Sequence, residues 1–162
     1  FTDGWFHTGD IGEILPSGDI KITDRKKDLI KTAGGKYIAP QRLESFLKTN
    51  PYISNVHIHG DQEKYIVALV TLNKGNTLTY AKENNLQYED FASLTQHPSV
   101  LELVRNGVAE ANAHLASFES IKRFAVLPVE FSVDSGELTP SLKTKRKFLD
   151  KKFMKQINSL YS

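Results

Sequence analysis

Four short segments combine residue types that could bind or react with a ligand. The first runs from Gly4 to Asp10 and reads Gly-Trp-Phe-His-Thr-Gly-Asp. Its glycines permit a tight loop, and the Asp10 carboxylate could accept two hydrogen bonds from a vicinal diol such as ribose. The same pattern is typical of a turn at a strand end with Trp5 packed beside it. By its own spacing, this segment favours the turn.

The second segment, Asp24 to Lys31, is a charge cluster between two predicted elements. It places Arg25 among several lysines, which suits either an anion site or a solvated linker, and by itself the cluster favours the linker. The fourth segment, Leu138 to Lys147, is a Thr/Ser turn followed by a run of cations ahead of a predicted helix. Taken alone, it favours a solvated, basic helix start over a ligand site.

The third segment is Gly34-Gly35-Lys36-Tyr37. Two residues without Cβ atoms let a backbone pass close to a narrow ligand, although they also simply make a turn. Neither G-x-x-x-x-G-K-[ST] nor G-x-G-x-x-G occurs in the chain, and these are the usual phosphate-binding loops. Nucleotide triphosphate binding by this chain alone therefore lacks its usual signature.

The histidines carry weaker signals. His57 and His59 share one face of a predicted strand, but no third His, Cys or carboxylate pair accompanies them at the short spacing of a metal site. We therefore predict no metal site and a solvent-facing strand surface for this pair. His7 could act as an acid or base, yet no motif places a nucleophile beside it.

The elements that position these segments follow from hydrophobic periodicity. The pattern predicts, in order, a hairpin over 11–23, a helix from Pro40 to Asn50, strands over 56–60 and 66–72, helices over 77–84 and 98–118, a strand over 124–129 and a closing helix over 149–160. Strands and helices in this mixture favour an α+β fold, with a small mixed sheet and packed helices.

Composition limits the classes of protein. The chain has 162 residues, 40% of them hydrophobic, with a net charge of +2 and no cysteine. This excludes a disordered chain, a disulfide framework and a thiolate nucleophile. No apolar run reaches the ~18 residues that a membrane span needs. Because the first residue is Phe1 rather than Met, we expect a piece of a longer chain.

In this order, the four segments resemble the C-terminal part of the acyl-activating, adenylate-forming superfamily, which includes acyl-CoA synthetases, luciferases and peptide-synthetase adenylation domains. Residues 4–10 are similar to the family's G-W-[FL]-x-T-G-D segment, and residues 24–31 to its D-R-x-K-D-x-[IL]-K linker. Residues 34–40 are similar to G-[GY]-x-x-[IV]-x-P, which runs into a helix with Glu44.

The chain departs from the family near its end, where many members carry P-x-T-x-x-G-K-[IL]-x-R. Leu142 stands in place of the glycine. This variant and a helical insertion over about 73–120 are similar to the long-chain fatty acyl-CoA synthetase branch. Alignment on the Thr/Ser residues and Arg146 assigns the family's catalytic lysine to Lys143, with Lys145 and Lys147 as close competitors.

The resemblance implies a mobile C-terminal lid domain over 26–162, preceded over 1–25 by a β-hairpin remnant of a larger adenylation domain. It implies that Asp10 and Arg25 hold the nucleotide and that the lid turns about a hinge at Lys27, with Asp24 as the competing choice. Gly34, Gly35 and Lys36 would form the loop that meets the pantetheine of CoA.

The implied reaction is a two-step ligation in which a fatty carboxylate and Mg-ATP give acyl-AMP, and the CoA thiol then displaces AMP. The ATP phosphates and Mg²⁺ would be held mainly by the N-terminal adenylation domain, so we expect the 162-residue chain to be inactive alone. The implied location is cytoplasmic, with possible peripheral membrane contact.

Two alternatives remain. The chain could be the lid of an adenylate-forming enzyme that loads a carrier protein instead of free CoA. It could also be a binding module whose basic helix, over 143–155, contacts nucleic acid or an anionic membrane. The nearly balanced charge and the absence of a stacking aromatic set beside the basic run count against nucleic acid.

Overall fold

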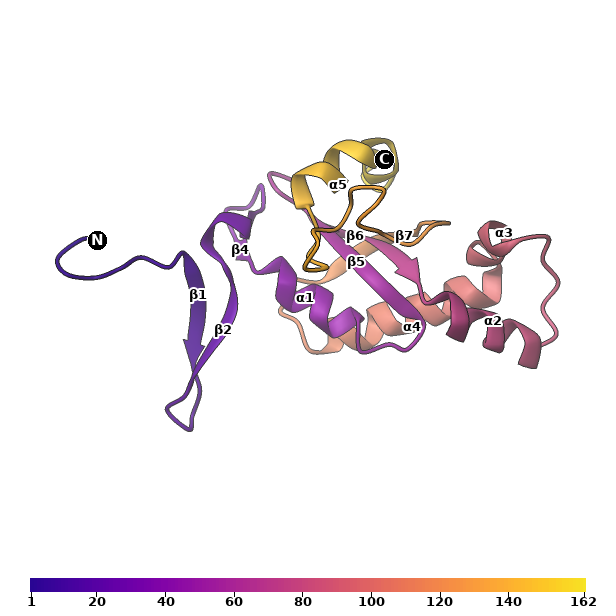
Figure 1. Ribbon diagram of the computed structural model, residues 1–162, viewed down its shortest axis with the longest axis horizontal. Coiled ribbons are helices and arrows are strands. Elements are labelled where there is room, and N and C mark those ends of the chain that lie inside the picture. Colours follow the sequence, from indigo (N-terminus) through magenta and orange to yellow (C-terminus); the bar gives the residue numbers. More distant parts are fainter.

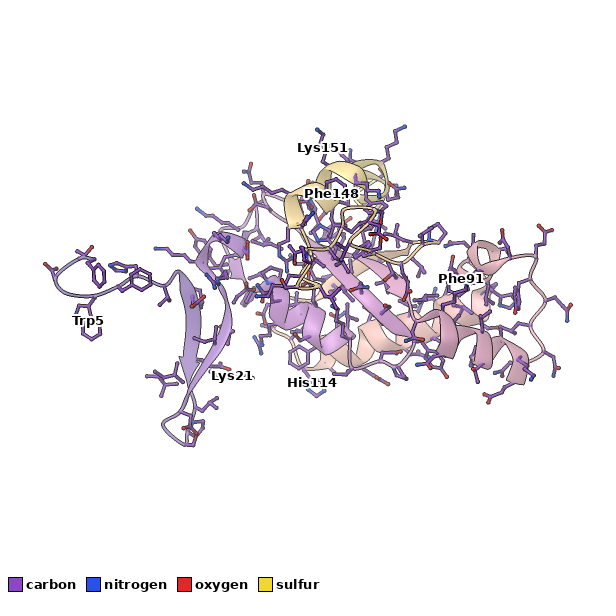
Figure 2. The ribbon with its side chains drawn as sticks, viewed as in Figure 1. Trp5, Lys21, Phe91, His114, Phe148 and Lys151 are labelled. Carbon is purple, nitrogen blue, oxygen red and sulfur yellow. The ribbon has the colours of Figure 1, made fainter.

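The structure is a computed structural model that describes residues 1–162. It begins with an antiparallel hairpin of β1 (Asp10–Ile14) and β2 (Ile20–Arg25), which confirms the predicted hairpin. The hairpin and the segment before it project from one end of the molecule (Figure 1). Their apolar side chains are largely exposed, and Trp5 extends from this arm without a covering element (Figure 2).

The linker after the hairpin is short and ordered. A 3-10 turn, η1 (Lys26–Asp28), precedes β3 (Ile30–Lys31), which pairs with β4 (Tyr37–Ile38). Helix α1 (Pro40–Leu47) follows and begins with proline, a residue whose fixed φ suits the first helical position and whose missing N–H is not needed there. The linker therefore delivers the chain directly from the hairpin to the first helix of the main body.

The central sheet has the order β5-β6-β7, built from β5 (Ile53–His59), β6 (Ile66–Leu72) and β7 (Ile121–Val126). Strands β5 and β6 are antiparallel, whereas β6 and β7 are parallel. Every residue of β6 is buried. The continuous apolar sequence of this strand follows from its position, because it is central in the sheet and both of its faces are covered.

The connection from β6 to the parallel strand β7 contains α2 (Lys74–Glu83), α3 (Phe91–Thr95) and α4 (Pro98–Ala113). Helix α4 packs with α1 on one face of the sheet and supplies Val100, Val104 and Val108 to the larger core. It ends five residues before the predicted end at Phe118. The Asn112 side chain pairs with both the N–H and the C=O of Ile121, which turns the chain into β7.

The C-terminal segment covers the other face of the sheet. Its helices α5 (Arg146–Lys152) and α6 (Met154–Ser159) replace the single closing helix that the sequence predicts. The break lies at Phe153, whose ring packs 6.0 Å from that of Phe131. A second core joins the sheet, the preceding loop and these helices through Leu69, Leu127, Phe131, Leu138, Leu149 and Ile157. The α+β prediction is therefore confirmed.

Two further observations complete the fold. Helices able to cross a membrane, by length and apolar character, are absent. The prediction of a solvent-facing surface at His57 is wrong, because this side chain is only 1% exposed. It lies on the face of β5 that α5 covers, where Asp150 meets it. Sequence spacing could not show this contact, since Asp150 is 93 residues away along the chain.

Candidate active site

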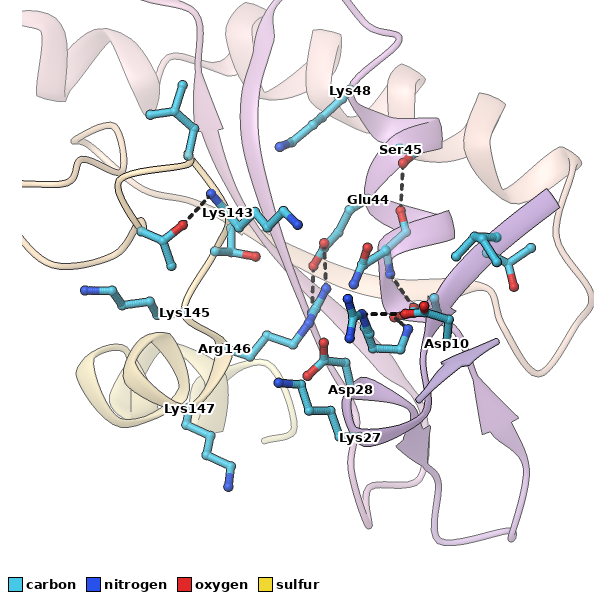
Figure 3. Close-up of a pocket in the computed structure, with 18 of the residues that line it drawn as sticks. Asp10, Lys27, Asp28, Glu44, Ser45, Lys48, Lys143, Lys145, Arg146 and Lys147 are labelled. Carbon is cyan, nitrogen blue, oxygen red and sulfur yellow. Dashed lines mark hydrogen bonds and ion pairs between the residues drawn. The ribbon is translucent and has the colours of Figure 1, made fainter. Parts of the chain in front are cut away.

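A polar cleft of about 1150 Å³ lies between the hairpin, α1 and the loop before α5 (Figure 3). Only 3 of the 19 residues that line it are hydrophobic. Its walls hold seven lysine and arginine side chains against four carboxylates. The cleft is therefore suited to a polar, anionic ligand rather than to an apolar chain.

Most of this positive charge is free to act on a ligand. Two carboxylates are already paired with arginine, Asp10 with Arg25 and Glu44 with Arg146. By contrast, none of the lysines of the cleft forms an ion pair; these are Lys27, Lys48, Lys143, Lys145 and Lys147. Several unpaired cations around one hollow attract phosphate and carboxylate groups.

Asp10 and Arg25 face each other across the hairpin. They are register partners at the base of β1 and β2, and Arg25 Nε lies 2.6 Å from Asp10 Oδ1. The pair uses one oxygen of the carboxylate and one nitrogen of the guanidinium. The second oxygen of Asp10 remains available to accept a hydroxyl, and the terminal nitrogens of Arg25 remain available to donate to an anion.

Asp24 is fixed in place by backbone contacts. It is 2% exposed, and its Oδ1 accepts a hydrogen bond from the N–H of Arg25 at 2.7 Å. Its Oδ2 accepts from the N–H of Gln41 at 3.0 Å, in the first turn of α1. The residue before that helix supplies no side-chain cap, so Asp24 performs the capping role from a distant strand.

The loop that carries Lys143 is closed by its own threonine. Thr139 donates its N–H to the C=O of Lys143 at 2.8 Å, and its Oγ1 accepts from the N–H of Lys143 at 3.0 Å. Within this loop Leu142 has a φ of +59°. That is the left-handed conformation for which glycine is best suited, and the family's glycine stands at this position. Leu142 therefore keeps the glycine-type turn despite its side chain.

The three competing lysines differ in direction. In Figure 3 the side chain of Lys143 extends toward the middle of the cleft, in the direction of Glu44, whereas Lys145 extends away from it. Lys147 lies on α5 and points along the outer side of the cleft (Figure 3). The arrangement supports Lys143 as the lysine that meets a ligand in the cleft.

Glu44 and Arg146 connect two walls of the cleft. The guanidinium of Arg146 makes two parallel hydrogen bonds to the Glu44 carboxylate, at 2.8 and 2.7 Å. Glu44 Oε1 also accepts from the N–H of Ile58 in β5 at 3.1 Å. Because both side chains are at most 15% exposed, this two-point pair fixes the start of α5 against α1.

The Gly34–Lys36 turn is not part of the cleft. Gly35 has a φ of +74°, and Thr32 closes the turn with hydrogen bonds to Lys36. Gly34 is different, because a Cβ placed there would meet only Thr32 Oγ1, at 4.0 Å. No packing within the domain requires a glycine at 34, which leaves its bare backbone facing open space.

The structure thus brings five of the predicted site residues to one cleft, Asp10, Asp24, Arg25, Lys27 and Lys143. It places the glycine turn elsewhere. Sequence reasoning attached no role to Glu44 or Arg146, although both stand in the motifs, and it overlooked Lys48. A Glu and an Arg that lie 102 residues apart carry no pairing signal in one sequence.

The fold and the cleft define an α+β domain with a basic cleft for an anionic ligand. A family model described as "AMP-binding enzyme C-terminal domain" matches residues 27–162, and the chain belongs to this family.

Relatives in the curated proteins agree. The chain is 39% identical over 163 residues to a long-chain-fatty-acid–CoA ligase, FadD15, of Mycobacterium tuberculosis. This match covers 100% of the chain and 27% of the relative. It is 35% identical to human long-chain-fatty-acid–CoA ligase 1, covering 99% of the chain and 23% of the relative. The chain therefore spans about a quarter of the length of the relatives that it matches.

Solved structures share the fold. The adenylation domain of a carboxylate reductase from Mycobacterium chelonae superimposes with a TM-score of 0.76 at 26% identity, over 99% of this chain and 24% of that one. A didomain of adenylation and carrier domains from the carboxylic acid reductase of Segniliparus rugosus gives a TM-score of 0.72 at 22% identity. This match covers 100% of this chain and 21% of that one.

Proposed function

We propose that the chain is the lid of a long-chain fatty acid–CoA ligase, acting on an active site that a larger N-terminal adenylation domain completes. The observation that carries the proposal is the cleft with five unpaired lysines, into which Lys143 extends. The chain's identity of 35–39% to long-chain ligases supports the substrate class.

In the first step, the carboxylate of a fatty acid attacks the α-phosphate of ATP, a new C–O–P linkage forms and pyrophosphate leaves. Two anions approach each other, so negative charge concentrates between them. Lys143 is placed to stabilise it with one ammonium group on a flexible stem. Asp10 would hold the ribose hydroxyls with its free oxygen, and Arg25 would donate to the nucleotide from its free nitrogens.

In the second step, the CoA thiol attacks the acyl carbon of acyl-AMP and AMP leaves. Gly34 and Gly35 offer a backbone without side chains to the narrow pantetheine arm. Lys36 adds a cation beside them, 5.7 Å from the ring of Phe118. Since this turn lies outside the lysine cleft, one reaction centre would meet the two sites in turn, which requires the lid to rotate.

The hinge is best placed at Lys27. Asp24 is buried, and both of its oxygens bind backbone amides, so rotation of its own backbone would also disturb its hydrogen bond to the N–H of Arg25. Lys27 lies in the 3-10 turn η1 and forms no ion pair. Rotation near Lys27 still has to release the bond from Asp24 to Gln41, which gives this contact the role of a latch between the lid and the hairpin.

The proposal is tested with the full-length protein that carries this domain. Supplied with ATP, Mg²⁺, CoA and palmitate, it should release AMP and pyrophosphate and form palmitoyl-CoA, while the 162-residue chain alone should form none. A phosphopantetheinylated carrier protein in place of CoA tests the alternative acceptor. Acylation of the carrier without palmitoyl-CoA formation would overturn the CoA assignment, and product formation by the isolated chain would overturn the role as a lid.

A further inference from the structure

Helix α5, which follows the Lys143 loop, depends on contacts from outside itself. It has only seven residues, no side-chain N-cap, and one buried residue, Leu149. A helix this short is not stable by its own hydrogen bonds. Its orientation, and with it the position of the loop that ends at Lys145, must therefore be fixed by tertiary contacts.

Asp150 provides one such contact with two histidines. Its Oδ1 accepts hydrogen bonds from Nε2 of His57 at 2.8 Å and from Nδ1 of His59 at 2.7 Å. The histidines alternate along β5 and so present the same face to α5. Burial alone would raise the pKa of the Asp150 carboxyl, but the two hydrogen bonds outweigh burial and hold that pKa well below its usual range.

The second contact lies one helical turn away. Arg146 and Asp150 are four residues apart and share one face of α5. Arg146 binds Glu44, and Glu44 binds the N–H of Ile58, the residue between the two histidines. The Asp150 contact and the Arg146 contact therefore end on three consecutive residues of β5, His57, Ile58 and His59.

The geometry fits a hydrogen-bonded clamp better than a metal centre. The three groups could offer one ligand atom each, all within 4.8 Å of one another. However, ligand atoms around a tetrahedral zinc lie about 3.3 Å apart, because each sits about 2.0 Å from the metal. Here the N···O separations are 2.8 and 2.7 Å, which are ordinary hydrogen-bond lengths.

His57 Nδ1 adds a second argument. This atom is buried and has no hydrogen-bond partner. If Nε2 bound a metal, Nδ1 would carry a proton with no acceptor, whereas metal-bound histidines normally donate that proton to a neighbour. If Nε2–H instead donates to Asp150, the neutral ring leaves only an acceptor lone pair unpaired at Nδ1. The tautomer with its proton on Nε2 therefore suits the buried site, and it is also the one that donates a hydrogen bond to Asp150.

We propose that His57, His59 and Asp150 form a positioning clamp that fixes α5 on β5 and thereby places Lys143 for the adenylation step. The inference rests on the proposed function for its catalytic part. It makes His57, His59 and Asp150 positioning residues, since none of them lines the cleft.

The test compares two half-reactions in the full-length protein. Asp150→Ala should slow single-turnover formation of acyl-AMP by about tenfold or more, as expected for a misplaced catalytic group. Thioester formation from supplied acyl-AMP should change less than twofold, because the glycine turn is held separately. Asp150→Asn keeps an acceptor oxygen and should recover most of the adenylation rate. In a Lys143→Ala background, Asp150→Ala should have no further effect.

Lys151→Ala is the matched control, because Lys151 is the neighbour of Asp150 on α5 and extends into solvent (Figure 2). It should leave both half-reactions unchanged. Equal loss in both half-reactions for Asp150→Ala would indicate general destabilisation and overturn the clamp's catalytic role, as would no loss in either. Stoichiometric zinc that survives dialysis in the wild type and is lost in His59→Ala would overturn the clamp in favour of a metal centre.

A second measurement separates the clamp from the proposed function. In Asp150→Ala, hydrogen exchange of the amides over 143–153 should accelerate about tenfold, and in Lys151→Ala it should not. If the wild type forms no acyl-AMP, the proposed function fails and with it the catalytic part of the inference. The accelerated exchange would still establish the clamp on α5, and unchanged exchange would overturn that as well.

Discussion

At the scale of single residues, the backbone conformation of Leu142, the residue before Lys143, is unfavourable for a residue with a side chain. Leu142 adopts a φ of +59° and is 69% exposed, so its side chain contributes little packing while its backbone occupies a costly region. A left-handed conformation costs a non-glycine residue roughly 1 to 2 kcal/mol. The loop is therefore held in shape by Thr139 and not by the preference of Leu142.

Leu142→Gly should consequently stabilise the protein by about 0.5 to 1 kcal/mol, because relief of the backbone cost exceeds the added freedom of the unfolded chain. Urea unfolding of the wild type and the variant measures the difference. Leu15→Gly serves as a control outside this loop and should destabilise. A lower unfolding free energy for Leu142→Gly would show that the leucine side chain holds the loop.

At the scale of elements, the sequence predicts the strands and helices that are determined by neighbouring residues in the chain. Residues 66–72 form a buried strand as their apolar run indicates, and Pro40 marks the first turn of α1. The prediction is right for the start of α4 at Pro98 and wrong for its C-terminal end and within the closing helix, where long-range contacts decide. Leu115 and Phe118 keep a helical period but belong to the turn that Asn112 pulls toward β7.

The glycine turn gives the sharpest prediction at this scale. Gly34→Val should leave stability and acyl-AMP formation nearly unchanged, since a Cβ at 34 has room, and should depress thioester formation by blocking the pantetheine arm. Stopped-flow measurement of each half-reaction tests this. Gly35→Val is a poorer probe, because its φ of +74° adds backbone strain. Equal loss in both half-reactions for Gly34→Val would remove the turn from the second step.

At the scale of the whole molecule, one buried carboxylate connects the loop before α5 to the C-terminal end of that helix. Glu137 is buried and binds Lys152 of α5, while Ser135 and the N–H of Ser132 also donate to it. Burial would raise the pKa of Glu137, but the hydrogen bonds from Lys152 and Ser135 lead the opposing effects and lower it to about 2. None of these pairings is visible in the sequence.

This lowered pKa predicts a stability that depends on pH. The unfolded Glu137 titrates near 4.5 and the folded one near 2, so the unfolded state binds more protons in between. The stabilisation is fully present above about pH 5 and is lost as the pH falls toward 2. In Glu137→Gln, the free energy of unfolding should decrease less between pH 5 and pH 2. The difference from the wild type should be roughly 2 kcal/mol, as for hydrogen bonds to a charged group. Parallel slopes for both proteins in urea unfolding from pH 5 to 2 would contradict the assignment.

The sequence also predicts the cleft residues better than their partners. The motif order indicates Asp10, Arg25 and Lys143, and the fold gathers all three in one cleft. The supports, Asp24 on α1 and Glu44 on Arg146, act over 17 and 102 residues. A single chain without aligned relatives carries no signal for such pairs, because either partner is an ordinary charged residue until the fold joins them.

The most direct test of the central claim is single-turnover acyl-AMP formation by Lys143→Ala and Lys145→Ala in the full-length protein. Loss of one preorganised cation should raise the adenylation barrier of Lys143→Ala by about 2 to 4 kcal/mol. Lys145→Ala, whose side chain extends away from the cleft (Figure 3), should change it by less than about 1 kcal/mol, as for an exposed charge. A crippled Lys145→Ala beside an active Lys143→Ala would contradict the account.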